Sequence, residues 1–189
     1  MRLILTAVPL FMASGCSSQA AETPVAPPAS ERAGGAAPSD FMMAAEVRGQ
    51  SERRQEFVGP GETLQNWSRR VTVQRFGGAS PTIDPLAFVR LGMEDLPRIC
   101  PGATIGQVSE TRISGRPAAR VQAHCPRAPF GGGPESFVML AFSGDSYMHA
   151  VSIAFRPSAR DHDLAWAWEH LSNVTLCKDR ETAGACRSS

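Results

Sequence analysis

The residue with the most definite chemistry is Cys16, whose thiol stands at the end of a short apolar leader. Arg2 gives the leader a positive start, Leu3–Ala13 is mostly apolar, and Ser14-Gly15 supplies small residues before the cysteine. The apolar run is shorter than the roughly 20 residues that a membrane-spanning helix needs. It has instead the three regions of a secretory signal. We therefore predict that residues 1–15 are a signal peptide removed on export.

The ending Ala13-Ser14-Gly15-Cys16 resembles the lipobox of bacterial lipoproteins, although Leu is commoner where this chain has Ala13. The resemblance implies a diacylglyceryl thioether on Cys16, cleavage before it, and acylation of the new amine. Two or more acyl chains hold a protein stably at a membrane. In the sorting rule of enteric bacteria, Ser17 favours the outer membrane. We expect a lipid-anchored protein of the bacterial cell envelope that faces the periplasm; the alternative is a plain secretory signal with an incidental Cys16.

Four cysteines remain, and thiols in an oxidising compartment form disulfides. They are Cys100, Cys125, Cys177 and Cys186, an even number that predicts two disulfides from three combinations. We expect Cys100–Cys125 and Cys177–Cys186, the second of which closes a short terminal loop. A cysteine metal site is the weaker hypothesis, because the chain has no CxxC pair and the spacings do not match a zinc ribbon.

The tripeptide Gly144-Asp145-Ser146 could supply a serine nucleophile, since GDS-type esterases carry one in such a tripeptide. Those enzymes place the serine early, after a parallel strand and before a helix, and need a late Asp-x-x-His. Here the tripeptide lies between two expected antiparallel strands, where Gly and Asp favour a turn. We predict a turn and no catalytic residue. An esterase-like envelope hydrolase using Ser146 stays as the alternative.

The four histidines show neither HxH nor HExxH spacing; they are His124, His149, His162 and His170. His149 could meet His124 across a sheet and bind a metal, which leaves a small-ligand or metal carrier as a second alternative. Histidines with a purely structural role are commoner. The sequence therefore predicts no metal site and no cofactor.

Trp166 and His170 are spaced i, i+4 on an expected helix, on the side away from its apolar stripe. Side chains at this spacing are neighbours on a helix surface. The pair is predicted to be exposed, and an exposed Trp is typical of a contact surface. Packing of the pair on residues 40–54 or on a loop is the equal alternative.

The charge of the chain is close to balanced, with 19 basic and 18 acidic side chains and a net charge of +1. Loss of residues 1–15 removes Arg2 and brings the side-chain charge to 1 − 1 = 0. An electrostatic nucleic-acid binder needs a clustered excess of Lys and Arg. We therefore expect no nucleic-acid partner.

The composition divides the chain after the leader into a linker and a folded domain. Residues 17–40 are rich in Ala, Pro, Ser and Gly, which cannot bury enough surface to offset the entropy of ordering. Residues 41–55 are either a short helix or more linker. We therefore expect lipidated Cys16 and a flexible linker over 16–55 and one globular domain over 56–189.

Periodicity predicts the elements of that domain. Alternation indicates strands over 67–76, 104–113, 116–125, 136–142 and 147–155, with Trp67, Val71 and Val73 on one face. Asp84-Pro85 is typical of a helix start, and a last helix is expected from Asp161 to about Thr175. Because strands follow one another directly, the sheet should be antiparallel. The fold class is α+β, with a sheet covered by two helices.

The segments Gly61–Trp67, ending Asn-Trp, and Val71-Thr72-Val73 resemble a group of uncharacterised exported proteobacterial proteins with a GETxxNW…VTVQ pattern. The likeness extends to Cys100-Pro101 and Cys125-Pro126 and covers about residues 56–177. It implies a Cys100–Cys125 pair that ties the first helix to the sheet. The order of elements is also similar to the Mog1/PsbP-like α/β sandwich. No activity is established for the group, so the resemblance implies no chemistry.

These residues lead to one hypothesis on function. The chain is expected to be an envelope lipoprotein that is not an enzyme. Its domain would serve as a binding or accessory module, held to the membrane by lipid and contacting an envelope protein or another envelope component.

Overall fold

The computed structural model describes residues 31–77, 83–128, 132–178 and 186. The predicted signal peptide, Cys16 and Ser17 lie outside these residues. The strands are β1 (Glu31–Gly34), β2 (Met42–Arg48), β3 (Glu52–Val58), β4 (Arg69–Gly77), β5 (Thr104–Ile105), β6 (Ser109–Ile113), β7 (Arg116–Cys125), β8 (Glu135–Ser143), β9 (Tyr147–Phe155) and β10 (Thr175–Lys178). The helices are α1 (Pro85–Glu94), the single turn α2 (Leu96–Ile99) and α3 (Asp161–Ser172).

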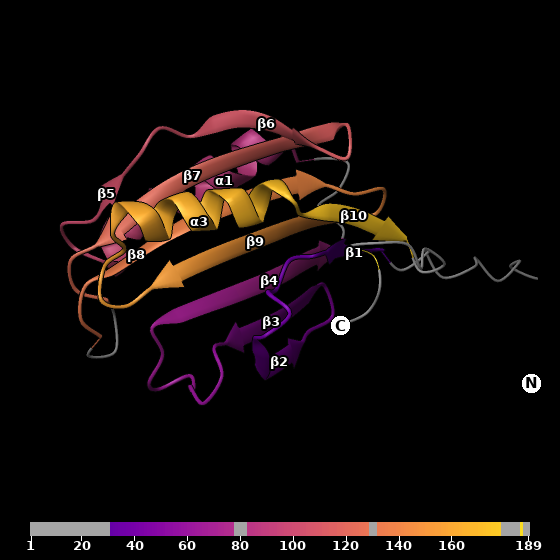
Figure 1. The fold of residues 1–189 in the computed structure, drawn as a ribbon. Coiled ribbons are helices and arrows are strands. Elements are labelled where there is room, and N and C mark those ends of the chain that lie inside the picture. Colours follow the sequence, from indigo (N-terminus) through magenta and orange to yellow (C-terminus); the bar gives the residue numbers. More distant parts are fainter. Residues whose placement is uncertain (1–30, 78–82, 129–131, 179–185, 187–189) are drawn as a thin grey trace, which may run out of the picture.

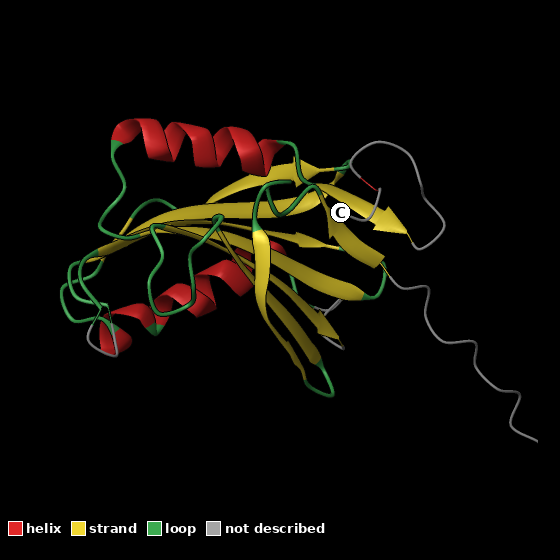
Figure 2. Ribbon diagram, turned by 60° about the horizontal axis from the view of Figure 1, so that its bottom comes forward, coloured by secondary structure: helices red, strands yellow, loops and turns green. Residues whose placement is uncertain are grey.

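One antiparallel sheet forms the body of the molecule (Figure 1). Its strand order is β2-β3-β4-β9-β8-β7-β5, and β6 also pairs with β7. A separate ribbon joins β1 to β10, the first and last described strands. The helices lie on both faces of the sheet (Figure 2), so the fold has three layers. The α+β class and the antiparallel sheet are confirmed.

Local sequence explains where the helices begin. The Asp84 side chain accepts a hydrogen bond from Ala87 N at 3.1 Å, and Pro85 occupies the first turn of α1, as predicted. Two acids, Asp161 and Asp163, stand in the first turn of α3, where the helix dipole favours negative charge. Among the described residues, no helix is long and apolar enough to cross a membrane.

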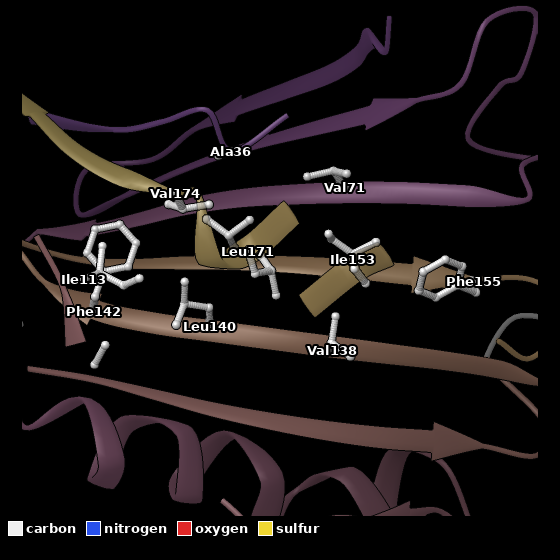
Figure 3. Close-up of a cluster of buried hydrophobic side chains, with 13 residues drawn as sticks. Ala36, Val71, Ile113, Val138, Leu140, Phe142, Ile153, Phe155, Leu171 and Val174 are labelled. Carbon is white, nitrogen blue, oxygen red and sulfur yellow. The ribbon is translucent and has the colours of Figure 1, made fainter. Parts of the chain in front are cut away.

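Alternating side chains of the same strands build a core on each face. On one face, Leu140 and Ile153 pack with Leu171 of α3 (Figure 3). On the other, Ala141 and Ala150 belong to a cluster with Val89 and Met93 of α1. Small alanines in the second cluster let α1 approach the sheet closely. We call the two sides the α3 face and the α1 face.

The predicted linker is wrong over residues 31–55, because most of this segment is strand. Glu31–Gly34 pairs with β10, and the expected domain start at residue 56 falls inside β3. Residues 42–48 and 52–58 are neither helix nor linker but the β2–β3 hairpin at the edge of the sheet. Backbone hydrogen bonds in the ladder stabilise these strands even though nearly all of their side chains are exposed or half-buried.

Three boundaries also differ from the prediction. The last helix ends at Ser172, and Thr175 instead starts β10. This strand pairs with β1, which lies far from it in the sequence. Trp67 precedes β4 and packs with Val58 and Ala154 in a separate cluster, away from Val71. The expected strand 104–113 is broken into β5 and β6.

The structure joins Cys100 to Cys125 and Cys177 to Cys186, the two pairings expected. The first link connects the end of α2 to the end of β7. The second holds β10 to the residues after it, and Cys177 is fully buried. The first link therefore ties the helical segment to the sheet.

Loss of the two disulfides should have graded effects on stability. In the chain-entropy model, Cys100→Ala with Cys125→Ala should lower the free energy of unfolding by about 3 to 4 kcal/mol, and the Cys177/Cys186 pair by about 2 to 3. The order follows from sequence separations of 25 and 9 residues. Urea unfolding of both double variants measures this. A larger loss from the Cys177/Cys186 pair would contradict the loop-length explanation.

Candidate functional site

The Gly144–Ser146 tripeptide forms the turn between β8 and β9 and holds a buried carboxylate. Backbone N–H groups of Asp145, Ser146 and Tyr147 donate to the Glu31 carboxylate at 2.8, 3.0 and 2.9 Å. Glu31 is only 2% exposed. Successive backbone N–H groups in a turn form a typical anion-binding concavity. The predicted turn is confirmed, and its backbone binds the first residue of β1.

The other atoms of the tripeptide also have structural contacts. A Cβ on Gly144 would lie 2.0 Å from Glu31 Oε1, so only glycine fits there. The Asp145 carboxylate accepts from Lys178 at 2.8 Å and also pairs with Arg116, and these hydrogen bonds lower the pKa of Asp145. Among the described residues, no histidine nitrogen bonds the Ser146 hydroxyl. The turn thus holds β1, β7 and β10 together.

His149 is buried beside Glu31 at 1% exposure. Its ring stacks on Phe142 at 5.1 Å, and its Nε2 lies 3.5 Å from Glu31 Oε1, too far for a well-formed hydrogen bond. Burial lowers the pKa of His149 to about 4, against the opposing effect of the Glu31 charge, and nearby Arg75 lowers it further. The imidazole is therefore neutral near pH 7.

His124 and His149 do not meet across the sheet, so this part of the metal hypothesis is wrong. His124 is the register partner of Ser136 on β8, whereas His149 is the partner of Phe142. Six residues of strand separate the two positions, roughly 20 Å. His124 Nδ1 instead contacts the hydroxyls of Ser136 at 3.1 Å and Ser158 at 3.3 Å. No group of three His, Cys, Asp or Glu that could hold a metal occurs in the described residues.

Trp166 and His170 stack on each other, but the pair is half-buried rather than exposed. The Trp166 ring lies edge-on to Phe155, and the Arg69 guanidinium stands 4.8 Å from its centre. His170 Nε2 contacts the backbone oxygen of Ala36 at 3.0 Å. The pair therefore connects α3 to the chain around Ala36. Its role as a contact surface for another molecule remains a prediction.

Residues 31–41, which we call the strap, cross the α3 face of the sheet beside α3. A groove of about 560 Å³ lies between the strap and strands β3 and β4. Its apolar side chains are those of Ala33, Ala36, Ala37, Met43, Phe57 and Val73. We call this hollow the strap groove. Its volume falls in the range typical of small-molecule sites.

Charge in the strap groove is mainly positive. Arg32, Arg53 and Arg75 line it, and the only acid in its lining is Glu31, whose carboxylate is already bound by the turn. Sequence reasoning missed the groove because residues 31–55 were expected to be linker. The groove could have been found only from the pairing of β1 with β10, which no local pattern indicates.

A second hollow of about 640 Å³ lies beside Trp168. Its lining includes Arg120, Gln122 and His124 from β7 and Ile105 from β5. The Arg120 guanidinium stands 5.5 Å from the Trp168 ring centre. Apolar side chains, among them Ile105, Val121 and Trp168, line this hollow together with the polar ones.

The Gly61–Trp67 segment, which carries the resemblance to exported proteins, has a structural role. The Glu62 carboxylate accepts hydrogen bonds from Gly59 N at 3.2 Å and from Ser68 N at 3.0 Å. Trp67 is 4% exposed, with the guanidinium groups of Arg70 and Arg156 at 4.5 and 4.4 Å from its ring. These contacts fix the loop before β4 and form no open site.

Comparison with known proteins does not assign the chain to a family. No protein-family model matches the chain, and no curated protein matches it. A function for the chain therefore has to follow from its own residues.

Substitution of Gly144 tests the carboxylate-binding turn. Gly144→Ala should lower the free energy of unfolding by about 2 to 3 kcal/mol, because the new methyl group displaces Glu31 and leaves buried polar groups unpaired. Gly133→Ala is the matched control, since a Cβ there meets nothing within 4 Å. Thermal or urea unfolding of both variants measures the difference. Equal stabilities would show that Glu31 does not occupy the turn.

The buried histidine should make stability depend on pH. The unfolded chain binds a proton at His149 with a pKa near 6.5, whereas the folded chain does so only near 4. Between these values the unfolded state binds more protons, so stability falls as the pH falls. His149→Phe keeps the stacking on Phe142 and should have a shallower pH dependence between pH 6.5 and 5. Urea unfolding at several pH values measures this. If the free energy of unfolding changes equally with pH in the two proteins over that window, the assignment is wrong.

Proposed function

We propose that the chain is a lipoprotein of the bacterial cell envelope whose domain is a non-catalytic binding module. In this proposal residues 1–15 are cleaved, Cys16 carries the lipid, and the domain faces the periplasm, at the outer membrane as Ser17 suggests. The two disulfides support an oxidising compartment. Acyl chains on Cys16 would keep the domain near the membrane without a spanning helix.

The observation that carries the binding role is the strap groove. It combines apolar side chains with arginine guanidinium groups, as ligand sites do when a few polar groups orient a mainly apolar ligand. Ser146, which together with the histidines is the support for the hydrolase alternative, contributes a backbone N–H to Glu31. The groove is therefore assigned to binding rather than to catalysis.

The proposal also includes the fold family of the domain. Helices on opposite faces of an antiparallel sheet are also expected of the Mog1/PsbP-like sandwich, and we infer that the domain belongs to this architecture. The Gly61–Trp67 loop and the Cys100–Cys125 link support membership of the exported proteobacterial group. Neither likeness supplies an activity.

The lipid anchor is tested on the full chain, expressed in a bacterium that processes lipoproteins. Mass spectrometry should find a mature protein that begins at acylated Cys16, and the protein should sediment with membranes. Cys16→Ser should release it into the periplasmic fraction, because the acylated thiol is lost. A bare Cys16 thiol in the wild-type protein would refute the anchor.

The binding role is tested in the same preparation. Protein purified from the envelope should retain a compound that denaturation releases and mass spectrometry detects. Gln55→Trp, which places an indole in the strap groove, should abolish this retention without loss of membrane attachment. If the wild-type protein and Gln55→Trp release the same compounds, the groove is not the binding site.

A further inference from the structure

Three arginines stand side by side across β2, β3 and β4 next to the strap groove. Arg48 is the register partner of Arg53, and Arg53 is the register partner of Arg75. Directly opposed residues have Cβ atoms roughly 4.5–5.5 Å apart, and like charges in such pairs are destabilising. We call these three residues the arginine row.

The arginine row lies between two hollows on the surface. Arg53 and Arg75 line the strap groove and also a smaller hollow of about 230 Å³, which Arg48 and Tyr147 line as well. A ligand in the strap groove therefore has its end at the guanidinium groups. The smaller hollow gives those groups access from the other side.

Three acidic residues lie near the arginine row. Glu46 pairs with both Arg48 and Arg53, at 2.6 Å each. The Glu31 carboxylate is bound by backbone N–H groups of the turn, and Glu52, which also lines the smaller hollow, accepts from Gln74 Nε2 at 3.2 Å.

Arg75 has the least compensated charge of the three. Among the described residues it has no ion pair. Its Nη1 donates to the backbone oxygen of Glu31 at 3.1 Å, and its guanidinium lies 4.4 Å from the centre of the Tyr147 ring. Neutral His149, its register partner on β9, adds no negative charge. A negative group of a ligand would be attracted to this end of the groove.

Away from the row, the floor of the strap groove is mainly apolar but includes Gln55, whose amide donates to Met43 Sδ at 3.5 Å. Phe57 and Val73 come from neighbouring strands and contact the α3-face core, and Ala33 and Ala36 belong to the strap above them. Met43 closes the side near β2 and is 54% exposed. An apolar channel that ends at arginines matches a molecule with an apolar chain and an anionic head group.

We infer that the strap groove binds the anion of a long-chain fatty acid, with its carboxylate on Arg53 and Arg75 and its acyl chain along Phe57 and Val73. The inference rests on the proposed binding role. A carboxylate matches the planar fork of donors on a guanidinium. Cys16 and Glu31 are only fifteen positions apart, which limits the distance from anchor to groove to about 50 Å. The groove is thus within reach of the acyl lipids at the membrane.

The test uses residues 16–189 with Cys16→Ser, exported to an oxidising compartment so that the disulfides form. The probe is cis-parinarate, a fatty acid whose fluorescence rises in apolar surroundings. Palmitate should displace it, whereas hexadecanol, which has the same chain and no charge, should bind about tenfold more weakly or less. The factor of about ten corresponds to loss of one charge-assisted hydrogen bond.

Two substitutions locate the head group and the chain. Arg53→Gln should weaken palmitate binding about tenfold and bring it close to that of hexadecanol. Arg54→Gln is the matched control, because Arg54 is the next residue of β3 and does not line the groove. Gln55→Trp should abolish binding of both compounds. Circular dichroism and melting temperature confirm that each variant is folded.

Three results would overturn the inference. Equal affinities for palmitate and hexadecanol would show that the arginines do not bind the carboxylate. Equal losses of palmitate affinity in Arg53→Gln and Arg54→Gln would show the same. Failure of cis-parinarate to bind would exclude a fatty acid altogether, and tighter binding of lysophosphatidate would replace the carboxylate by a phosphate. None of these results alters acylation of Cys16 or the retention of another compound by the envelope protein, so they leave the proposed function separately testable.

Discussion

The buried carboxylate of Glu31 is the interaction on which the rest of this structure depends. Moving a carboxylate out of water is strongly unfavourable unless it is paired or hydrogen-bonded. Here three backbone N–H groups of the β8–β9 turn bind it, and His149 lies beside it. Because Glu31 begins β1, this contact fixes the start of the strap against the centre of the sheet. Without it, the segment before β2 would have little apolar surface to hold it down.

The strap has a second attachment further along the chain. His170 of α3 contacts the backbone oxygen of Ala36, and Trp166 stacks on His170. The two attachments hold the strap across β3 and β4 with a hollow beneath it, rather than flat on the sheet. A tight strap would bury Phe57 and Val73 completely. The groove is therefore a consequence of where the two polar attachments lie.

How much of the fold could be predicted from the sequence depends on how far apart the interacting residues are in the chain. The strands β8 and β9, the turn between them and the start of α1 follow from alternation, turn chemistry and capping, which are local. The strand β3 contains the run Glu52-Arg53-Arg54-Gln55-Glu56, which is polar on both faces and has no detectable period. It is a strand only because β2 and β4 pair with it.

The candidate site was harder to predict than the fold for the same reason. Glu31 binds backbone groups more than a hundred residues away, and backbone donors leave no trace in the sequence. Thr175 was expected to continue a helix. Its strand partner is Gly34 of β1, which lies far from it in the sequence. The disulfide pairings could be predicted from the sequence, since few combinations of four cysteines exist and one pair closes a short loop.

Charged side chains are arranged differently at two places on the sheet. On the α1 face opposite charges alternate: Arg70 lies between Glu56 and Glu135 at 3.7 and 3.6 Å, and Glu135 also pairs with Arg156 at 3.0 Å. On the α3 face, three arginines oppose one another directly, with Glu46 serving two of them. Folding alone favours the first arrangement, because like charges in register are destabilising. An arrangement like the second is expected where an external anion supplies the missing charge, and the arginine row stands where the apolar floor of the strap groove ends.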